Sequence, residues 1–506
     1  MDAPTARRID QIGPIFAGDP LRCLAAAAIL LVSACVGTPR VAGVPGASPA
    51  PQVPWAPPAA IVRPVQPVDT SAQAAVPAEL ATRIHQLTLA EIVDLGLRNN
   101  TATRLAWANA QTAAAAYGSQ RGAWLPTLDA DVSASRIKTV ASQGRVSVQQ
   151  SVLSPSLTLS YLLFDFGGRT GRIEGARQQL FSAGFTQNAT IQSVVLQIEV
   201  AYFQYLASRS LLGAQRTSLE EAQANLAAAE ERRRVGVATI ADVLQARTAA
   251  SQAQLNLQTT EGNLQTARGA LALSLGLPAN LPYDVDSTAA EVPVAALADS
   301  VNALIGEALK GRPDLAAARA EAEAARAGIS ETRAALLPSL NLSATGGRTY
   351  TGTIPNGANS YNVSLGLTIP LFNGFSRQYD LRAARFQAEA ASAQAESVRQ
   401  QVVYQVFSSY YALQTATRRV GTAEDLVASA QQSNEVALGR YKGGVGSILD
   451  LLQAQTALAS ARAQRVDVRL AWSVALAQLA HDSGVLDPRG GNPLRLTTDT
   501  TSTPSR

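Results

Sequence analysis

Two aspartates of this 506-residue chain, Asp242 and Asp450, stand in near-identical stretches where they could cap a helix or present charge to a ligand. Each follows a hydroxyl residue by three positions, Thr239 in the first copy and Ser447 in the second, which is the spacing of a capping box. The cap residue of such a box stabilises a helix start by about 0.5 to 2 kcal/mol. Capping accounts for both aspartates, and a further role of their charge stays open.

Other residues that could do chemistry are few and scattered. The two histidines, His85 and His481, lie far apart in sequence, and we interpret both as surface residues rather than catalysts. Asp129 and Asp131 share one face of an expected strand, and a polar strand face explains them more simply than paired catalytic acids. The glycine-rich stretch 166–172 lacks the lysine and spacing of a phosphate-binding loop. We therefore predict no enzyme activity, no cofactor and no metal site.

The two aspartates belong to a duplication that organises most of the chain. Nine residues of 236–249 recur 208 positions later in 444–457, and upstream the offset becomes 212, where 123–135 matches 335–347. A period of about 200 residues is too long for a solenoid unit, so it indicates a duplicated, domain-sized half. We place the two halves at 83–285 and 298–486.

The N-terminus has the form of an export signal. Arg22 precedes the apolar run 24–32, and small residues then lead to Cys35. This pattern predicts a lipoprotein signal peptide over 1–34, with lipid attached to Cys35 after cleavage. The alternative is an ordinary secretory signal with a coincidental cysteine. Either signal directs export, and since Cys23 lies inside it, the mature protein has no disulfide.

The composition favours long helices with extended ends. Only 16% of the residues are charged and 5% are aromatic, which suits helices packed through small side chains rather than several compact cores. Prolines crowd 35–82, which we interpret as a tether, and 487–506 has the composition of a disordered tail. The net charge is +4, and apart from the triple arginine 232–234 the cations are spread, so we expect no nucleic-acid partner.

Short runs of period two interrupt the helical stretches in both halves. In the run 360–372, apolar residues from Tyr361 to Leu371 alternate with small, mostly polar residues. Strands are expected at about 126–138, 155–165, 338–350 and 360–372. Their length and alternation fit either transmembrane strands or a soluble sandwich, and the lack of an apolar helix after the signal favours the membrane. Four strands cannot close a barrel, so a barrel would be shared between chains.

Proline-poor helical stretches follow each pair of strands. Helices are expected at about 169–234, 239–276, 376–442 and 447–482. The first helix of each pair would extend on the order of 100 Å. The duplicated stretches are then the turns of two helical hairpins, both far from the strands.

These features together resemble the TolC family of outer membrane efflux proteins. The resemblance covers about 87–485 and rests on the duplicated half, the Leu-Pro strand entries at 125–126 and 337–338, the strand exits and the two hairpin turns. It implies a mainly α fold with a small β part. Long antiparallel helical hairpins would form an α-barrel, and four strands per chain would contribute to a trimeric 12-stranded transmembrane β-barrel.

The resemblance also implies a function. The chain would be a trimeric outer-membrane channel of a tripartite efflux or type I secretion system, a passive conduit for small molecules or proteins. It would be lipid-anchored in the outer membrane with a helical extension into the periplasm. Its partners would be membrane lipid, a periplasmic adaptor protein, and an inner-membrane transporter or secretion ATPase. An alternative from another class is a periplasmic lipoprotein coiled-coil scaffold without a pore.

The family pattern assigns roles to residues at the turns. Asp450 would line a periplasmic constriction, with Tyr441 bracing the closed state, Asp242 as a partner and Gln453 one turn further on. Two departures weaken this assignment: Gly446 stands where the pattern has an arginine, and Gln453 where it has a second acid. The residues expected to contact the adaptor are Gly236, Val237, Thr239, Gly444, Val445 and Ser447.

Overall fold

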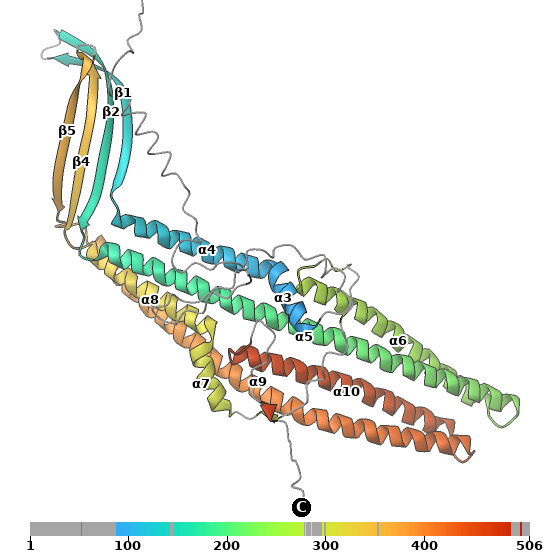
Figure 1. Ribbon diagram of the computed structural model, residues 1–506. Coiled ribbons are helices and arrows are strands. Elements are labelled where there is room, and N and C mark those ends of the chain that lie inside the picture. Colours follow the sequence, from blue (N-terminus) through green and yellow to red (C-terminus); the bar gives the residue numbers. More distant parts are fainter. Residues whose placement is uncertain are drawn as a thin grey trace, which may run out of the picture.

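The computed structural model describes most of the two halves. The described residues are 88–141, 146–277, 300–351 and 354–486, with isolated positions at 52, 279, 285, 296–297 and 496–497. The predicted signal peptide and Cys35 lie outside the described residues, as does the predicted tether apart from residue 52. The molecule is elongated, with a sheet at one end and the turns of two helical hairpins at the other (Figure 1).

Two β-hairpins form a four-stranded sheet and pair with each other through β2 and β4. The strands are β1 (Thr127–Ala141), β2 (Val146–Phe164), β4 (Ser339–Thr351) and β5 (Ile354–Thr368). Their order is β1-β2-β4-β5, and every neighbouring pair is antiparallel. The chain therefore has two open sheet edges, β1 and β5, which run in opposite directions.

Two of the expected strand boundaries were wrong. The strand expected at 155–165 begins earlier, at Val146, and the strand expected at 360–372 is Ile354–Thr368. Pro370 stands two residues after β5 and cannot continue it, because proline has no N–H for the sheet ladder.

Pro155 explains why the start of β2 was misplaced. A proline is expected at the beginning of a strand, yet Pro155 lies inside β2 and faces Val132 of β1. The pairing of β2 with β4 skips residues 154 and 155, between Leu153 and Ser156. The missing N–H therefore falls where the ladder is already interrupted.

Each half contributes a helical hairpin with the same two lengths. The long helices α5 (Gly168–Arg234) and α9 (Ser376–Lys442) have 67 residues each, about 100 Å at a rise of 1.5 Å per residue. The helices α6 (Ile240–Ser274) and α10 (Ile448–Asp482) have 35 residues each and pack back along them.

Four shorter helices were not among the expected elements. α3 (Leu89–Asn99) and α4 (Thr101–Arg121) precede the first β-hairpin, and α7 (Val301–Gly311) and α8 (Pro313–Ala334) precede the second. A single residue separates each pair, Asn100 in the first half and Arg312 in the second. These two residues stand 212 positions apart, the upstream offset of the duplication.

An arginine ties each β-hairpin to the helical body. Arg169 is buried and donates through Nη1 to the carbonyl oxygens of Leu162, at 2.9 Å, and Ala123, at 3.2 Å. Arg377, 208 positions later, donates to the carbonyl oxygen of Ala335. Each arginine thus bonds a backbone carbonyl just before its β-hairpin, Ala123 or Ala335, and Arg169 bonds β2 as well.

The largest core lies mid-molecule, where the short helices meet both hairpins. It includes Ile92 of α3, Ile198 of α5, Leu304 of α7 and Leu413 of α9. A separate pair of short strands, β3 (Ala296–Leu297) and β6 (Leu496–Thr497), is antiparallel. β6 falls within the tail expected to be disordered, so that prediction is wrong for these two residues, whose backbones pair with β3.

Candidate functional site

The sheet has one face of exposed apolar side chains. They include Leu128 and Val132 of β1 and Val363, Leu365 and Leu367 of β5, all at least 62% exposed. A continuous apolar face of this kind is uncommon in contact with water and fits contact with lipid. None of the helices in the described ranges is both long and apolar enough to cross a membrane.

The opposite face of the sheet is polar. Asp129 and Asp131 of β1 lie on it, opposite Thr158 and Ser156 of β2. The hydroxyls of Thr158 and Thr345 are 3.3 Å apart and join the two β-hairpins on this face. Such a face can line a water-filled lumen, as the alternation of apolar and polar residues suggested.

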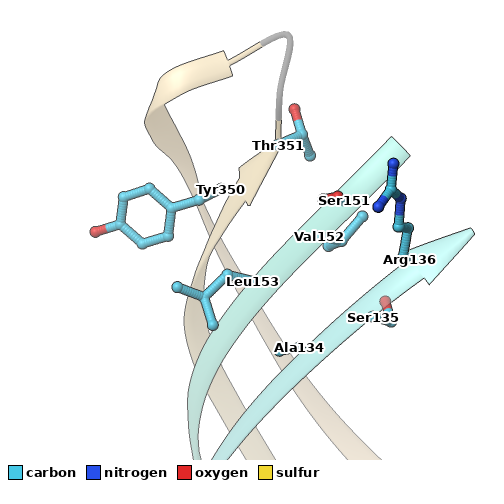
Figure 2. Close-up of a pocket in the computed structure, with 8 residues that line it drawn as sticks. All are labelled: Ala134, Ser135, Arg136, Ser151, Val152, Leu153, Tyr350 and Thr351. Carbon is cyan, nitrogen blue, oxygen red and sulfur yellow. The ribbon is translucent and has the colours of Figure 1, made fainter. Parts of the chain in front are cut away.

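The two β-hairpins separate near the end of the sheet that is remote from the helices. The pairing of β2 with β4 ends at Val152 and Thr351, and a shallow hollow of about 480 Å³ opens there (Figure 2). Arg136 and Ser151 lie on one side of it and Tyr350 on the other. Sequence reasoning did not single out this place.

At the opposite end of the molecule, both predicted capping boxes are confirmed. In the first, the N–H of Asp242 donates to Thr239 Oγ1 at 3.2 Å, and the N–H of Thr239 donates to Asp242 Oδ2 at 2.7 Å. In the second, the matching distances between Ser447 and Asp450 are 3.1 and 3.4 Å. The cap therefore holds the carboxylate of Asp450 less closely, and Asp450 is exposed.

Tyr441 joins the two helical-hairpin turns through an arginine that sequence reasoning did not assign. Arg232 of α5 donates through Nη1 to the carbonyl oxygen of Tyr441 at 2.7 Å, and its guanidinium lies 4.6 Å from the centre of the Tyr441 ring. Burial raises the pKa of Tyr441, the charge of Arg232 lowers it and that of Asp242 raises it. Among the described residues the buried Tyr441 hydroxyl has no hydrogen-bond partner.

The backbone explains why Gly446 has no side chain. A Cβ at Gly446 would lie 3.0 Å from Arg440 Cβ and 3.2 Å from the nitrogen of Tyr441. A side chain at position 446 would therefore require the turn to shift by a few tenths of an ångström. In this structure the cation beside Tyr441 comes from the other hairpin.

The remaining predicted site residues lie at the surface. Gly236, Val237, Thr239, Gly444, Val445, Ser447 and Gln453 are all exposed. Nearby, a groove of about 650 Å³ runs between the two hairpins, with Leu244 and Thr248 of α6 on one wall and Leu449 and Leu452 of α10 on the other. α6 and α10 contact each other far less than each contacts its own long helix, so this groove is open.

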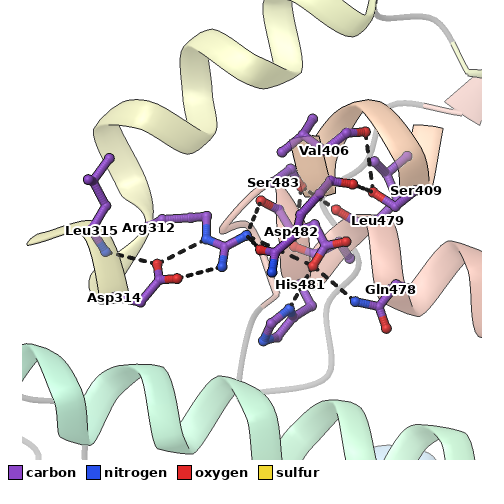
Figure 3. Close-up of polar contacts among 12 residues, drawn as sticks. Arg312, Asp314, Leu315, Val406, Ser409, Gln478, Leu479, His481, Asp482 and Ser483 are labelled. Carbon is purple, nitrogen blue, oxygen red and sulfur yellow. Dashed lines mark hydrogen bonds and ion pairs between the residues drawn. The ribbon is translucent and has the colours of Figure 1, made fainter. Parts of the chain in front are cut away.

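Arg312 links α8, α9 and the end of α10 through a buried network (Figure 3). It donates to the carboxylate of Asp314 at 3.0 and 2.6 Å, to Gln405 Oε1 at 2.6 Å and to the carbonyl oxygen of Asp482 at 3.3 Å. Burial raises the pKa of Asp314, but hydrogen bonding and the charge of Arg312 outweigh it, so the net pKa lies below the ordinary value. His481, expected at the surface, is only 19% exposed and contacts Asp482.

Two further features concern titratable groups. Burial raises the pKa of Glu199 on α5 to about 7. Across the described part of the chain, no group of three or more His, Cys, Asp or Glu side chains is placed to hold a metal ion.

Comparison with known proteins gives one family and several relatives. The family model described as outer membrane efflux protein matches residues 92–277 and 304–485. Protein CyaE of Bordetella pertussis is 28% identical over 389 residues, covering 76% of this chain and 81% of CyaE. The toluene efflux pump outer membrane protein TtgI of Pseudomonas putida is 26% identical, covering 76% of this chain and 82% of TtgI.

A solved structure shares the fold. The outer membrane protein VceC of Vibrio cholerae superimposes with a TM-score of 0.69 at 22% identity, covering 78% of this chain and 96% of VceC. The mainly helical architecture with a small antiparallel sheet is therefore an outer-membrane channel fold.

Proposed function

This chain belongs to the outer membrane efflux protein family, and we propose that it is the outer-membrane channel of a tripartite efflux or type I secretion system. It would act without catalysis, as a passive conduit for small molecules or proteins. The observation that carries the proposal is the sheet with one exposed apolar face and one polar face, joined to helical hairpins about 100 Å long.

The open sheet edges support a trimer. The outer edges of β1 and β5 have no neighbouring strand in the described chain, and the two strands run in opposite directions. β5 of one copy can therefore pair antiparallel with β1 of the next. Four strands are too few for a barrel, whereas three copies supply twelve. Closure would also protect edges that otherwise favour aggregation.

An exposed aromatic stripe on α9 supports the same assembly. Tyr404, Phe407 and Tyr411 follow one another at spacings of three and four and are 44–69% exposed. Large aromatic side chains in such a row are typical of a surface that another chain covers. In the trimer this stripe would pack on the neighbouring protomer and close the α-barrel.

The turns of the helical hairpins would form the constriction and the adaptor contact. Three copies of Asp450 would place three carboxylates around a narrow pore, favouring cations. Arg232, through Tyr441, would hold the two hairpins of a protomer together in the closed state. The open groove between α6 and α10 is the surface where a helical adaptor from the inner-membrane transporter complex would dock. Lipid on Cys35 would add an anchor.

Planar-bilayer conductance of purified, cross-linked trimers tests the proposal. Val363→Arg places a charge on the apolar face and should destabilise membrane insertion by about 2 to 4 kcal/mol, whereas Ser364→Arg, on the polar face, should insert normally and change conductance. Equal insertion of both variants, or a soluble elongated monomer after removal of the lipid, would instead support the scaffold without a pore.

Two substitutions test the constriction. Asp450→Asn keeps a hydrogen-bonding side chain at the cap but removes three charges from the pore, so cation preference and block by multivalent cations should weaken. Arg232→Gln should raise the open probability without altering ion preference. Unchanged selectivity of Asp450→Asn in folded trimers would restrict Asp450 to capping.

A further inference from the structure

We propose that outward-facing arginines at the far end of the sheet, Arg136 and Arg348, bind the phosphate groups of lipids in the outer leaflet of the membrane. This inference rests on the proposed function, since it requires the sheet to span the outer membrane as part of a trimer. Each trimer would then carry a ring of six arginines on its lipid-facing surface.

The two arginines are equivalent positions of the duplication. They stand 212 residues apart, and each lies nine residues after the first residue of its strand, Thr127 in β1 and Ser339 in β4. Alternation along the strands places Arg136 on the face of Val132 and Arg348 on the face of Leu342. Both halves therefore carry an arginine near the end of their apolar face, at equivalent positions of the duplication.

In a sheet that spans the membrane, both positions would lie toward the surface remote from the helices. The helical body joins the sheet at the start of β1 and β4 (Figure 1). Arg136 and Arg348 lie in the second half of these strands, toward the opposite end. Nine residues of a tilted strand rise about 25 Å, the height of the apolar band of an outer-membrane barrel. Lys138, two residues beyond Arg136 and on the same face, adds a third cation.

The surroundings of Arg136 suit an anionic headgroup with an acyl chain. Arg136 borders the hollow where β2 and β4 part, with the hydroxyl of Ser151 beside it and the apolar side chains of Ala134 and Leu153 among its walls (Figure 2). With the Gln149 amide oriented to accept, its oxygen lies 2.7 Å from Arg136 Nε and 3.0 Å from Nη2. A guanidinium has five N–H donors, so donors remain for a phosphate.

Arg348 lies beside an aromatic ring. Its guanidinium lies 5.4 Å from the centre of the Tyr350 ring, and Tyr350 stands 212 positions after Lys138. Tyrosine at the level of the headgroups and arginine at the level of the phosphates are the side chains that this depth favours. The combination of an apolar wall and a planar cation points to a phospholipid-like ligand rather than a free anion.

Lipid titration of the purified full-length trimer in neutral detergent, followed by native mass spectrometry, tests the site. The probes are diphosphoryl lipid A, the same lipid with its phosphates removed, and inorganic phosphate. The variant is Arg136→Gln with Arg348→Gln, and the matched control is Arg216→Gln with Arg385→Gln, two exposed arginines of α5 and α9.

The wild-type trimer should bind the phosphorylated lipid more tightly than the phosphate-free lipid. The double variant should lose about 30-fold in affinity for the phosphorylated lipid only, from about 1 kcal/mol for each basic residue at a charged surface, and the control should lose none. Equal binding of both lipids, an unaffected double variant, or equally tight binding of inorganic phosphate would overturn the proposal. A trimer destabilised by the double variant in the absence of lipid would show contacts between protomers instead. Failure of the wild type to form conducting trimers would count against the proposed function, independently of the lipid result.

Discussion

In each half, the residue between the two short helices contacts the end of the shorter hairpin helix, and the two halves make this contact, here called the joint, with different chemistry. In the first half, Asn100 Nδ2 donates to the carbonyl oxygen of Ser274 at the end of α6, at 3.1 Å. In the second half, the buried guanidinium of Arg312 takes the equivalent place at the end of α10 (Figure 3). In both, a left-handed glycine follows the helix, Gly276 or Gly484, 208 residues apart.

The two halves retained the geometry of the joint after the duplication, while its polar contacts diverged. A neutral amide needs one carbonyl, whereas a buried guanidinium needs several acceptors, including the carboxylate of Asp314. The net pKa of Asp314 is depressed, so its contribution to stability is present above its unfolded pKa and is lost as the pH falls through its lower native pKa. Below about pH 4 the second joint should therefore weaken while the first does not.

Removing the polar side chain should give the largest difference in unfolding free energy between the two joints. Arg312→Ala leaves Gln405 and the ends of α8 and α10 without their cation and should cost about 3 to 5 kcal/mol of unfolding free energy. Asn100→Ala loses a helix cap and one bond to a carbonyl, and should cost about 1 to 2 kcal/mol. Urea denaturation followed by circular dichroism measures both. Equal losses would show that the charge of Arg312 contributes nothing beyond a neutral cap.

For the glycines that follow α6 and α10, substitution should destabilise the first half more than the second. A Cβ at Gly276 would lie 2.6 Å from the backbone oxygen of Asn99, whereas a Cβ at Gly484 would meet its nearest atom, Arg312 Cγ, only at 3.2 Å. Both residues also have a φ that disfavours side chains. We expect Gly276→Ala to cost about 2 to 3 kcal/mol and Gly484→Ala about 1 to 2, measured by the same denaturation. A larger loss at Gly484 would contradict this account.

Glu199 offers a contrast that depends on pH. Its counterpart 208 residues later is Phe407, which is exposed, whereas Glu199 is buried with a pKa of about 7 against an ordinary 4.5. Because the native pKa is raised, neutral Glu199 contributes its full share to the stability of the fold below pH 4.5. This contribution is lost as the pH rises through 7, where the buried carboxyl ionises. Glu199→Gln should therefore stabilise the protein by about 1 to 3 kcal/mol at pH 8 and by little at pH 4.

Thermal unfolding at the two pH values measures this difference. Glu220→Gln, at an exposed acid of the same helix, is the control and should change stability little at either pH. A stabilisation by Glu199→Gln that is equal at pH 4 and pH 8 would rule out ionisation as its cause.

The smallest expected difference lies at the two capping boxes. The N–H of Thr239 donates to Asp242 Oδ2 at 2.7 Å, and the N–H of Ser447 donates to Asp450 Oδ2 at 3.4 Å. Thr239→Ala removes the cap bond and also a hydroxyl bond to Asp242 Oδ2 at 2.9 Å, whereas Ser447→Ala removes the cap bond. We therefore expect a cost of about 1.5 kcal/mol for Thr239→Ala and about 1 kcal/mol for Ser447→Ala, with ion selectivity unchanged in both. Hydrogen exchange of the first turns of α6 and α10 resolves the two effects. Altered selectivity in Ser447→Ala would show that the cap and the pore charge are coupled.

The sequence predicted those parts of the site that depend on local spacing. The capping boxes follow from a hydroxyl and an acid three residues apart, and the two faces of the sheet follow from alternation along each strand. The strand limits at Val146 and Thr368 were missed, since they depend on which neighbour each N–H faces. The short helices α3, α4, α7 and α8 were missed too, although their one-residue breaks at Asn100 and Arg312 keep the offset of the duplication.

By itself, then, the sequence determined the duplicated halves, the long helical hairpins and their caps, because helix and strand periodicities act between residues a few positions apart. The tertiary structure alone decided the order of the strands, the burial of Glu199 and the contact of Arg232 with Tyr441, 209 residues away. It also decided that Arg312 meets Gln405 and Asp482. Contacts between distant segments depend on which helices pack together and at what register, and no local spacing specifies that choice.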